Sequence, residues 1–369
     1  MTDLNLAASP AATVLAGFLA STHPPPTCAL FHGVLTPVEL DVRPREIEAL
    51  ALGAALHDRG WLRRVAVRGE DRLRWLSGMV TNMVKDLAPN TGAWNLVLNA
   101  QGRIQGDLTV WKESDGLELE VTADQAEKLL AHLDRFIIMD DVELVRLEEE
   151  TAVGLAGPKA GEILARLGLP VLPEPMMQAW AEWNGPALVR RGYGVLADHY
   201  AIWVRAAQAG DLWQALQAAG ATPVGAAALQ AFRIVEGIPV YGVDIVDRDL
   251  PQETSQLRAL HFDKGCYIGQ EIVERIRSRG NVHRHLRLLE LAGPLPVPGT
   301  RLTLDGAEAG HITSATELPL PGGARRFALG MIRSEAEARN LPLQYPVGET
   351  VGSASILPGS ADLQSSVER

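Results

Sequence analysis

The stretch Lys264-Gly265-Cys266-Tyr267-Ile268-Gly269-Gln270-Glu271 surrounds one of the chain's two cysteines with a lysine, two glycines and a Gln-Glu pair. A thiol acts as a nucleophile or a ligand only as the thiolate, and a nearby cation lowers its pKa. Gly265 and Gly269 permit a positive φ and the close approach of another group. The pattern favours a reactive Cys266 tuned by Lys264. From the residues alone, a small buried cysteine in a glycine-punctuated loop remains the alternative.

The residues after this cysteine predict a helix over 270–279, because Ile272, Val273 and Ile276 would share one face. The glycine that follows is a typical C-terminal stop. Cys266 would then lie in the loop that leads into a helix N-terminus, where the helix dipole also favours a thiolate.

The octapeptide resembles the signature of the YgfZ-type folate-binding proteins, which are relatives of the glycine-cleavage T-protein, an aminomethyltransferase. Further segments resemble the same proteins: residues 233–239 with Asp244, 251–253, 310–314 and 328–330. The likeness runs from roughly residue 40 to residue 355. It implies the T-protein fold, in which two α+β halves are followed by a small β-barrel.

The order of expected elements agrees with a duplicated fold. A strand at 65–67, a helix at 71–76, strands at 94–98, 104–111 and 117–121, and a helix from residue 123 follow one another. A similar order recurs after about 85 residues, with strands at 153–156, 187–190, 194–196 and 200–204. These units predict an α+β fold of two ferredoxin-like pseudo-repeat halves. From residue 286, short alternating runs between Gly-Pro turns predict a small β-barrel.

We therefore expect five segments along the chain. They are an N-terminal lead segment (1–40), a first α+β half that binds folate (41–148), a second α+β half with the Cys266 motif (149–285), the barrel (286–357) and a disordered tail (358–369). Residues 1–30 are rich in Ala, Pro and Thr and predict one short helix outside the core.

The composition limits the classes of function. The chain has 369 residues, a formal net charge of −11 and 47% hydrophobic residues, which argues against a general nucleic-acid binder. Two cysteines fit a reducing compartment. The absence of Lys or Arg before Arg43 argues against a secretory signal, and no apolar run approaches the roughly 20 residues of a membrane span. We expect a cytoplasmic protein with no stable binding to nucleic acid or membrane.

Asp107 is the first candidate for folate chemistry. Ile104 and Leu108 alternate with it, so its side chain points to the opposite face of the strand, and Gly106 permits close approach of a flat ligand. In T-proteins the matching stretch carries an aspartate pair that serves folate chemistry. Here Gly106 takes the first place and Asp107 the second. This difference argues against proton transfer at folate and leaves binding possible.

A second difference lies in the stretch that begins at Arg233. T-proteins place a glutamate where this chain has Val235, and Glu236 follows one position later. On a helix Glu236 would face about 100° away, so it either turns inward or is a surface glutamate before a glycine turn. Thr81 and Asn82 resemble the family's Thr-Asn pair, which lies near the folate cavity.

The predicted ligand is tetrahydrofolate or a derivative. The predicted reactive pair is Cys266 with Lys264, and the predicted folate-binding residues are Thr81, Asn82, Asp107, Arg233, Glu236, Tyr267, Gln270 and Glu271. No metal site is expected, because His283 and His285 lack a third nearby ligand.

The main hypothesis is a folate-binding accessory protein that supports assembly or repair of Fe–S enzymes, including tRNA-modifying ones, rather than a conventional enzyme. Its expected partners are folate and the Fe–S enzymes or their assembly machinery. Cys266 would attack a substrate, cap an oxidised partner or briefly ligate iron. The alternative is a folate-dependent aminomethyltransferase that moves a one-carbon unit. A folate-responsive binding module without chemistry is a third possibility.

Overall fold

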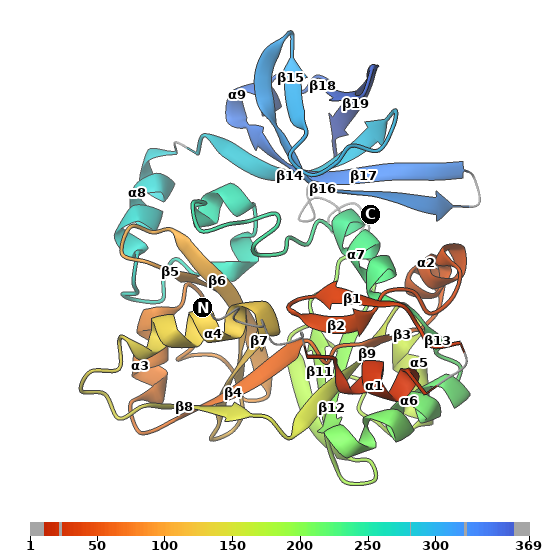
Figure 1. Cartoon of the computed structure of the whole chain (residues 1–369). Coiled ribbons are helices and arrows are strands. Elements are labelled where there is room, and N and C mark those ends of the chain that lie inside the picture. The colour runs from red at the N-terminus through yellow and green to blue at the C-terminus, as the bar shows by residue number, and fades with distance from the viewer. Residues whose placement is uncertain (1–10, 22–23, 281, 321–322, 358–369) are drawn as a thin grey trace, which may run out of the picture.

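This computed structural model describes residues 11–21, 24–280, 282–320 and 323–357. The two α+β halves share one 11-stranded sheet, and a closed barrel follows them along the chain (Figure 1). Within the described residues, no helix is both long and apolar enough to cross a membrane.

The first half contains β4 (Leu62–Arg68), α3 (Arg72–Met79), β5 (Thr91–Leu98), β6 (Ile104–Lys112), β7 (Leu117–Thr122), α4 (Ala123–Asp134) and β8 (Glu143–Leu147). The second contains β9 (Glu150–Ala156), α5 (Ala160–Arg166), β10 (Met177–Glu182), β11 (Pro186–Gly192), β12 (His199–Arg205), α6 (Ala209–Ala218) and β13 (Thr222–Pro223).

The strand order confirms the predicted pseudo-repeat. The first half runs β5-β6-β7-β4-β8, and the second runs β10-β11-β12-β9-β3-β13, with β3 (Ala55–Asp58) inserted next to the last strand. The halves join where Thr91 of β5 pairs with Met177 of β10. The strand expected at 194–196 is wrong, because these residues form a bend before β12. The sequence analysis missed β10, which takes the place that β5 has in the first half.

The N-terminal region contributes α1 (Val14–Leu19), β1 (Cys28–Phe31), β2 (Val34–Pro37) and α2 (Arg43–Leu52). The short helix is confirmed, but its expected place outside the core is wrong. Leu15 and Leu19 are buried in the core of the second half, beside Leu212 of α6. Burial of a leucine side chain contributes about 1.5–3 kcal/mol, which explains why this helix packs inward.

The predicted helix over 270–279 is confirmed as α8 (Gln270–Arg279). Gly280 ends it in the left-handed conformation with φ +68°, and its N–H donates to the carbonyl of Ile276. Ahead of α8 lie α7 (Ala226–Val235) and the short 3₁₀ turns η2 (Pro251–Thr254) and η3 (Leu257–Ala259).

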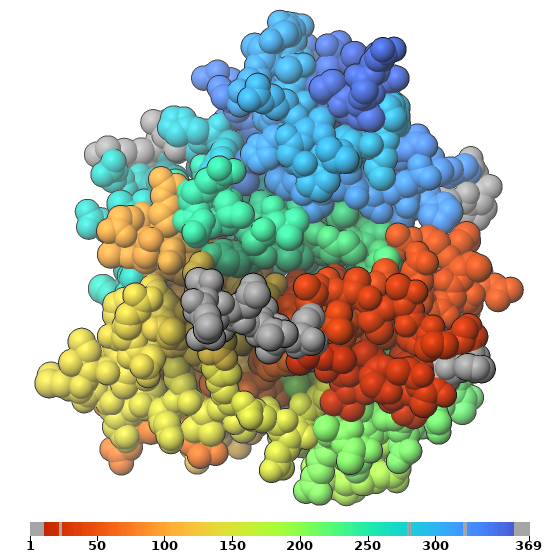
Figure 2. Space-filling view, in the orientation of Figure 1, coloured from red at the N-terminus to blue at the C-terminus, as the bar shows by residue number. Residues whose placement is uncertain are grey.

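The barrel is also confirmed. It contains β14 (Arg284–Ala292), β15 (Arg301–Leu304), β16 (Ala307–Leu320), β17 (Gly323–Arg333), α9 (Ser334–Glu337), β18 (Leu343–Val347) and β19 (Thr350–Ile356). It closes in the order β14-β17-β16-β15-β18-β19. Figure 2 shows the barrel, in blue, resting on the green and cyan residues that follow the second half. The predicted disordered tail, 358–369, lies outside the described residues.

One apolar core joins the three units. It contains Leu96 and Ile104 from the first half, Phe232 from α7, and Leu288 and Leu329 from the barrel. Because these residues pack in a single cluster, α7 and the barrel are held in fixed positions relative to the halves.

Candidate functional site

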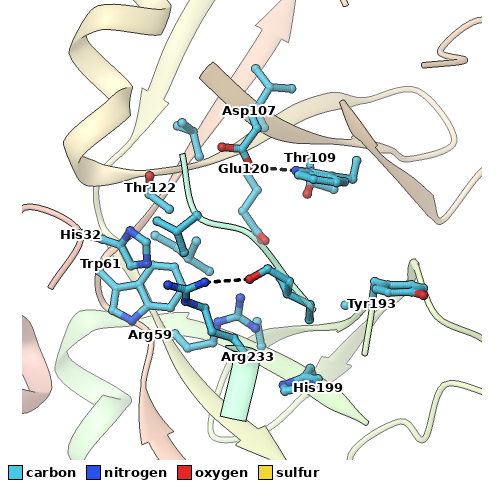
Figure 3. A pocket seen from close by; sticks show the side chains of 18 of the residues that line it. His32, Arg59, Trp61, Asp107, Thr109, Glu120, Thr122, Tyr193, His199 and Arg233 are labelled. Carbon is cyan, nitrogen blue, oxygen red and sulfur yellow. Dashed lines mark hydrogen bonds between the residues drawn. The ribbon is translucent and has the colours of Figure 1, made fainter. Parts of the chain in front are cut away.

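A cavity of about 280 Å³ lies between the two halves (Figure 3). Its walls come from β6 and β7 of the first half, β11 and β12 of the second, and α7 with the residues that follow it. Most of the side chains at its wall are aromatic or charged: Phe31, His32, His57, Arg59, Trp61, Trp94, Asp107, Trp111, Glu120, Arg190, Tyr193, His199, Phe232, Arg233, Glu236, Tyr241 and Arg258. We call this cavity the central pocket.

Ion pairs across the curled sheet close one side of the central pocket. Arg190 of β11 pairs with Glu118 and Glu120 of β7 at 2.5 and 3.1 Å, although four steps of strand order separate the two strands. Arg64 of β4 also pairs with Glu118, at 2.7 Å. The sheet therefore curls until its two halves face each other across the cavity.

Asp107 lies in the pocket wall, as a folate-binding role requires. Its carboxylate accepts hydrogen bonds from Trp94 Nε1 at 2.8 Å and from Gln125 Nε2 at 3.0 Å. Burial raises the pKa of Asp107, although these two donors oppose the shift. The carboxyl group therefore holds a proton at a higher pH than an exposed aspartate does.

Glu236 turns inward and is fully buried, which excludes the surface position. Helix α7 ends at Val235, and Glu236 is its C-cap, with helical dihedral angles and an N–H that donates to the carbonyl of Phe232. It accepts hydrogen bonds from the backbone N–H of Val195 and Leu196, both at 3.0 Å, and contacts His199 Nε2 at 2.9 Å. Burial favours protonation, but His199 and these N–H groups together lower the pKa of Glu236.

Arg233 lines the central pocket and ties it to the barrel. Its guanidinium pairs with Asp244 at 2.7 Å and donates to Ser314 of β16 at 3.1 Å and to the carbonyl of Ile238 at 2.9 Å. Because these partners occupy its donors, Arg233 fixes the loop after α7 while it contributes positive charge to the wall.

Thr81 and Asn82 lie outside the pocket lining. The Asn82 side chain donates to the carbonyls of Trp94 and Arg258, and the Thr81 hydroxyl donates to the carbonyl of Ala259. The pair thus holds the backbone of two residues whose side chains do line the pocket. A direct folate contact for Thr81 or Asn82 stays a prediction.

The sequence analysis missed several pocket residues. The Arg258 guanidinium lies 3.7 Å from the ring centroid of Tyr193 and 5.1 Å from that of Trp94. Such stacking of a cation on aromatic faces suits the flat surface of a heteroaromatic ligand. The signal that could have pointed to Trp94 is its strand, because Trp94 pairs directly with Thr109, two residues from Asp107.

The octapeptide 264–271 forms a loop that contributes no residue to the pocket lining. Lys264 is buried and donates to the carbonyls of Ser77 and Val80, at 2.8 and 2.5 Å, at the end of α3. Burial, with a smaller effect of Lys85, lowers the pKa of Lys264 to about 7. Its role in tuning Cys266 stays a prediction, while its hydrogen bonds show that it anchors this loop.

Of the other octapeptide residues, some are buried and some are exposed. Cys266 is exposed, which excludes the buried-cysteine alternative. Tyr267 is buried, its hydroxyl has no partner among the described residues, and burial raises its pKa to about 12. Gln270 accepts from the N–H of Tyr267 at 3.3 Å, and Glu271 is exposed in the first turn of α8. Folate contacts from these residues stay predictions.

No group of three or more His, Cys, Asp or Glu side chains with metal-site geometry occurs in the part of the chain that the structure describes. The basic residues after α8 have local partners instead. Arg284 pairs with Asp249 and Glu253, and His285 and Arg287 pair with Glu337.

Known proteins share this fold and sequence pattern. The family model of the GCVT N-terminal domain matches residues 36–264. The aminomethyltransferase of Geobacillus kaustophilus is 29% identical over 340 residues, covering 89% of this chain and 92% of that protein. The aminomethyltransferase of Rubrobacter xylanophilus is 30% identical over 313 residues, covering 83% of each. The crystal structure of glycine cleavage system aminomethyltransferase T from Bartonella henselae superposes with a TM-score of 0.84 at 20% identity, over 95% of this chain and 97% of that one.

Proposed function

The chain belongs to the GCVT aminomethyltransferase family, and from that premise we propose that its central pocket binds a tetrahydrofolate derivative and transfers a one-carbon unit. The observation that carries the proposal is the position of Asp107, a half-buried carboxyl group in the pocket wall beside Trp94. Relatives that align over more than four fifths of this chain are aminomethyltransferases, which supports transfer as well as binding.

The two differences from the T-protein pattern argue less strongly against one-carbon transfer when the positions of the neighbouring side chains are taken into account. Gly106 removes one carboxylate, but Asp107 remains at the pocket with a raised pKa. Val235 occupies the expected glutamate position, but Glu236, the C-cap residue of α7, lines the pocket one residue later. Among the carboxyl groups of the pocket, Asp107 thus has a raised pKa and Glu236 a lowered one.

The chemistry assigned to these residues is proton transfer and orientation. A buried carboxyl group with a raised pKa is suited to general acid–base catalysis near neutral pH, provided that it reaches the reacting nitrogen. Trp94 and Tyr193 would hold the flat ring system, and Arg258 would lie over its face or edge. Glu236, already occupied by three donors, would fix the wall rather than move a proton.

Two measurements test the proposal. Titration with tetrahydrofolate should change the fluorescence of the pocket tryptophans. An aminomethyl donor with tetrahydrofolate should yield methylenetetrahydrofolate, ammonia and the free carrier. Asp107→Asn should keep folate affinity within several-fold and lower the transfer rate by about 10²–10⁴-fold, the range typical of a lost acid–base group. Asp305→Asn, which alters an exposed carboxylate, is the matched control. Full activity in Asp107→Asn would remove the assigned role.

A second candidate function rests on Cys266. An exposed thiol on a loop anchored by a buried lysine suits a protein that supports Fe–S enzymes in the cytoplasm, as the YgfZ-type resemblance implies. In a bacterium that lacks its own YgfZ-type protein, the wild-type chain should restore an Fe–S tRNA-modifying enzyme under oxidative stress, and Cys266→Ala should not. Equal rescue by both forms would assign the thiol no part in that function.

A further inference from the structure

Arg59 is a pocket arginine whose guanidinium forms no ion pair with any described residue. Four arginines line the central pocket, and the guanidinium groups of Arg190 and Arg233 form ion pairs, while that of Arg258 stacks on Tyr193. The Arg59 guanidinium has no hydrogen bond or ion pair with any residue that the structure describes, and its Nε atom is buried. A partly buried cation without a direct counter-ion carries a desolvation cost, which an anionic ligand would offset.

Aromatic rings hold the Arg59 side chain in place. Its guanidinium lies 5.2 Å from the ring centroid of Trp61, whose Nε1 donates to the carbonyl of Asp58 at 3.1 Å. The His32 ring lies tilted against that of Trp61, with centroids 4.5 Å apart. Figure 3 shows His32, Trp61 and Arg59 on one side of the pocket, away from Asp107. The cation is therefore oriented before any ligand arrives.

His57 adds a second unsatisfied group two residues before Arg59. It lines the central pocket with a side chain 3% exposed, and its Nε2 has no partner among the described residues. A Cβ at residue 154 would lie 2.0 Å from His57 Cε1, so Gly154 lets the imidazole lie against β9. Burial, followed by the charges of Arg59 and His199, lowers the pKa of His57 well below its usual value. The ring is thus neutral and offers a hydrogen bond without a second charge.

The carboxylates around Arg59 accept hydrogen bonds from other donors. Glu120, the one whose charge acts on Arg59, accepts from Arg190 at 3.1 Å and from Trp203 at 3.2 Å. Asp58, the neighbour of Arg59, accepts from Thr13 and from the N–H of Gly60. No carboxylate of the described residues therefore neutralises Arg59 by direct contact.

We propose that Arg59, assisted by His57, is a subsite for the carboxylate of an organic ligand that binds in the central pocket. A guanidinium presents two parallel N–H groups that match the two oxygens of a carboxylate. A phosphate would bring about two negative charges to one point of a wall that also holds Asp107, Glu120 and Glu236, so a single carboxylate at Arg59 fits better. This subsite rests on the proposed function: in a folate, the carboxylate is one of the two that the benzoylglutamate tail carries.

The experiment compares ligand fragments. Wild-type protein is titrated with p-aminobenzoylglutamate, which carries the tail, and with 6-hydroxymethylpterin, which lacks any carboxylate. Arg59→Gln should weaken binding of the tail fragment by about 10- to 100-fold, the loss expected for a charge-assisted hydrogen bond, and change pterin affinity less than twofold. Arg59→Lys should fall between, because it keeps the charge and loses the paired donors. Arg339→Gln, at an exposed ion pair, is the control.

The outcomes separate this subsite from the folate proposal. Unchanged binding of the tail fragment to Arg59→Gln, or an equal loss for both fragments, overturns the subsite whether or not tetrahydrofolate binds. If tetrahydrofolate fails to bind but p-aminobenzoylglutamate and benzoate bind in an Arg59-dependent manner, the subsite stands and folate is the wrong ligand. If wild-type protein binds none of these probes, both proposals are overturned. Thermal melting of Arg59→Lys and Arg59→Gln verifies that each is folded.

Discussion

The central pocket and the octapeptide loop 264–271 both contain ionisable side chains, but the two regions hold them differently. In the pocket, Asp107 and Glu236 are each held by two or more hydrogen-bond donors, so their pKa values are set by the protein. In the loop, the charged residue Lys264 is turned inward to backbone carbonyls, while Cys266 is exposed to solvent. The most conspicuous motif of the sequence therefore anchors a loop and displays one thiol, whereas the pocket is assembled from residues scattered along the chain.

The largest expected effect is the loss of Glu236. Glu236→Ala leaves the N–H groups of Val195 and Leu196 and the ring of His199 without their buried acceptor. Breaking a buried charged interaction costs about 3–5 kcal/mol, and we expect a free energy of unfolding lower by that amount. Urea unfolding followed by circular dichroism measures it. Glu308→Ala, at an exposed pair with Arg333, should change stability by less than about 1 kcal/mol. Equal losses of unfolding free energy in Glu236→Ala and Glu308→Ala would show that the buried carboxylate stabilises the fold no more than an exposed one does.

Sequence patterns predicted the architecture better than the pocket. Periodicity and turn residues give α8 and the barrel, because local apolar spacing decides these elements. The positions of Arg59 and Arg258 depend on how strands far apart in the chain curl together, and no local pattern records that. Resemblance supplied Asp107, Arg233 and Glu236, which do line the pocket. It could not tell that Glu236 faces inward, since that depends on the N–H groups of Val195 and Leu196 and on His199, about 40 residues earlier in the chain.

The next prediction concerns how the octapeptide loop packs. Gly269 has φ +82°, and a Cβ there would lie 2.7 Å from the carbonyl oxygen of Asn99 in the β5–β6 turn. Gly269→Ala should therefore lower the free energy of unfolding by roughly 2–3 kcal/mol through the left-handed conformation and the contact together. Gly265→Ala is the matched control, because it has a similar φ of +84° with open space around its Cβ and should lose only about 1–2 kcal/mol. A larger loss of unfolding free energy in Gly265→Ala than in Gly269→Ala would contradict the close packing of Gly269 against the β5–β6 turn.

Lys264 should give a smaller, pH-dependent effect. Its pKa is about 7 in the folded chain and 10.5 in its ordinary state, so between these values the unfolded chain binds more protons. The contribution of Lys264 to stability therefore rises with pH from about 7 to about 10 and is constant below pH 6. At pH 8, Lys264→Met should lower the free energy of unfolding by about 1–2 kcal/mol, because it removes two buried hydrogen bonds. Urea unfolding of both proteins from pH 6 to pH 9.5 measures the difference, and a flat difference would show that the folded-state pKa is not lowered.

Cys266→Ala should have the smallest effect on stability. It also tests most directly whether the octapeptide loop, unlike the central pocket, is open to solvent. Because Cys266 is exposed and no hydrogen bond involves its thiol within the described residues, the free energy of unfolding should change by less than about 0.5 kcal/mol. Native protein treated with an aromatic disulfide reagent should show two phases of thiol labelling. Cys266 reacts in the fast phase, and Cys28 in the slow one, since burial and the charge of Asp58 raise the pKa of Cys28. Cys266→Ala should lose only the fast phase and Cys28→Ala only the slow phase. A fast phase that persists in Cys266→Ala would mean that the Cys266 thiol is not the accessible one. The loop would then be closed to solvent, as the pocket is.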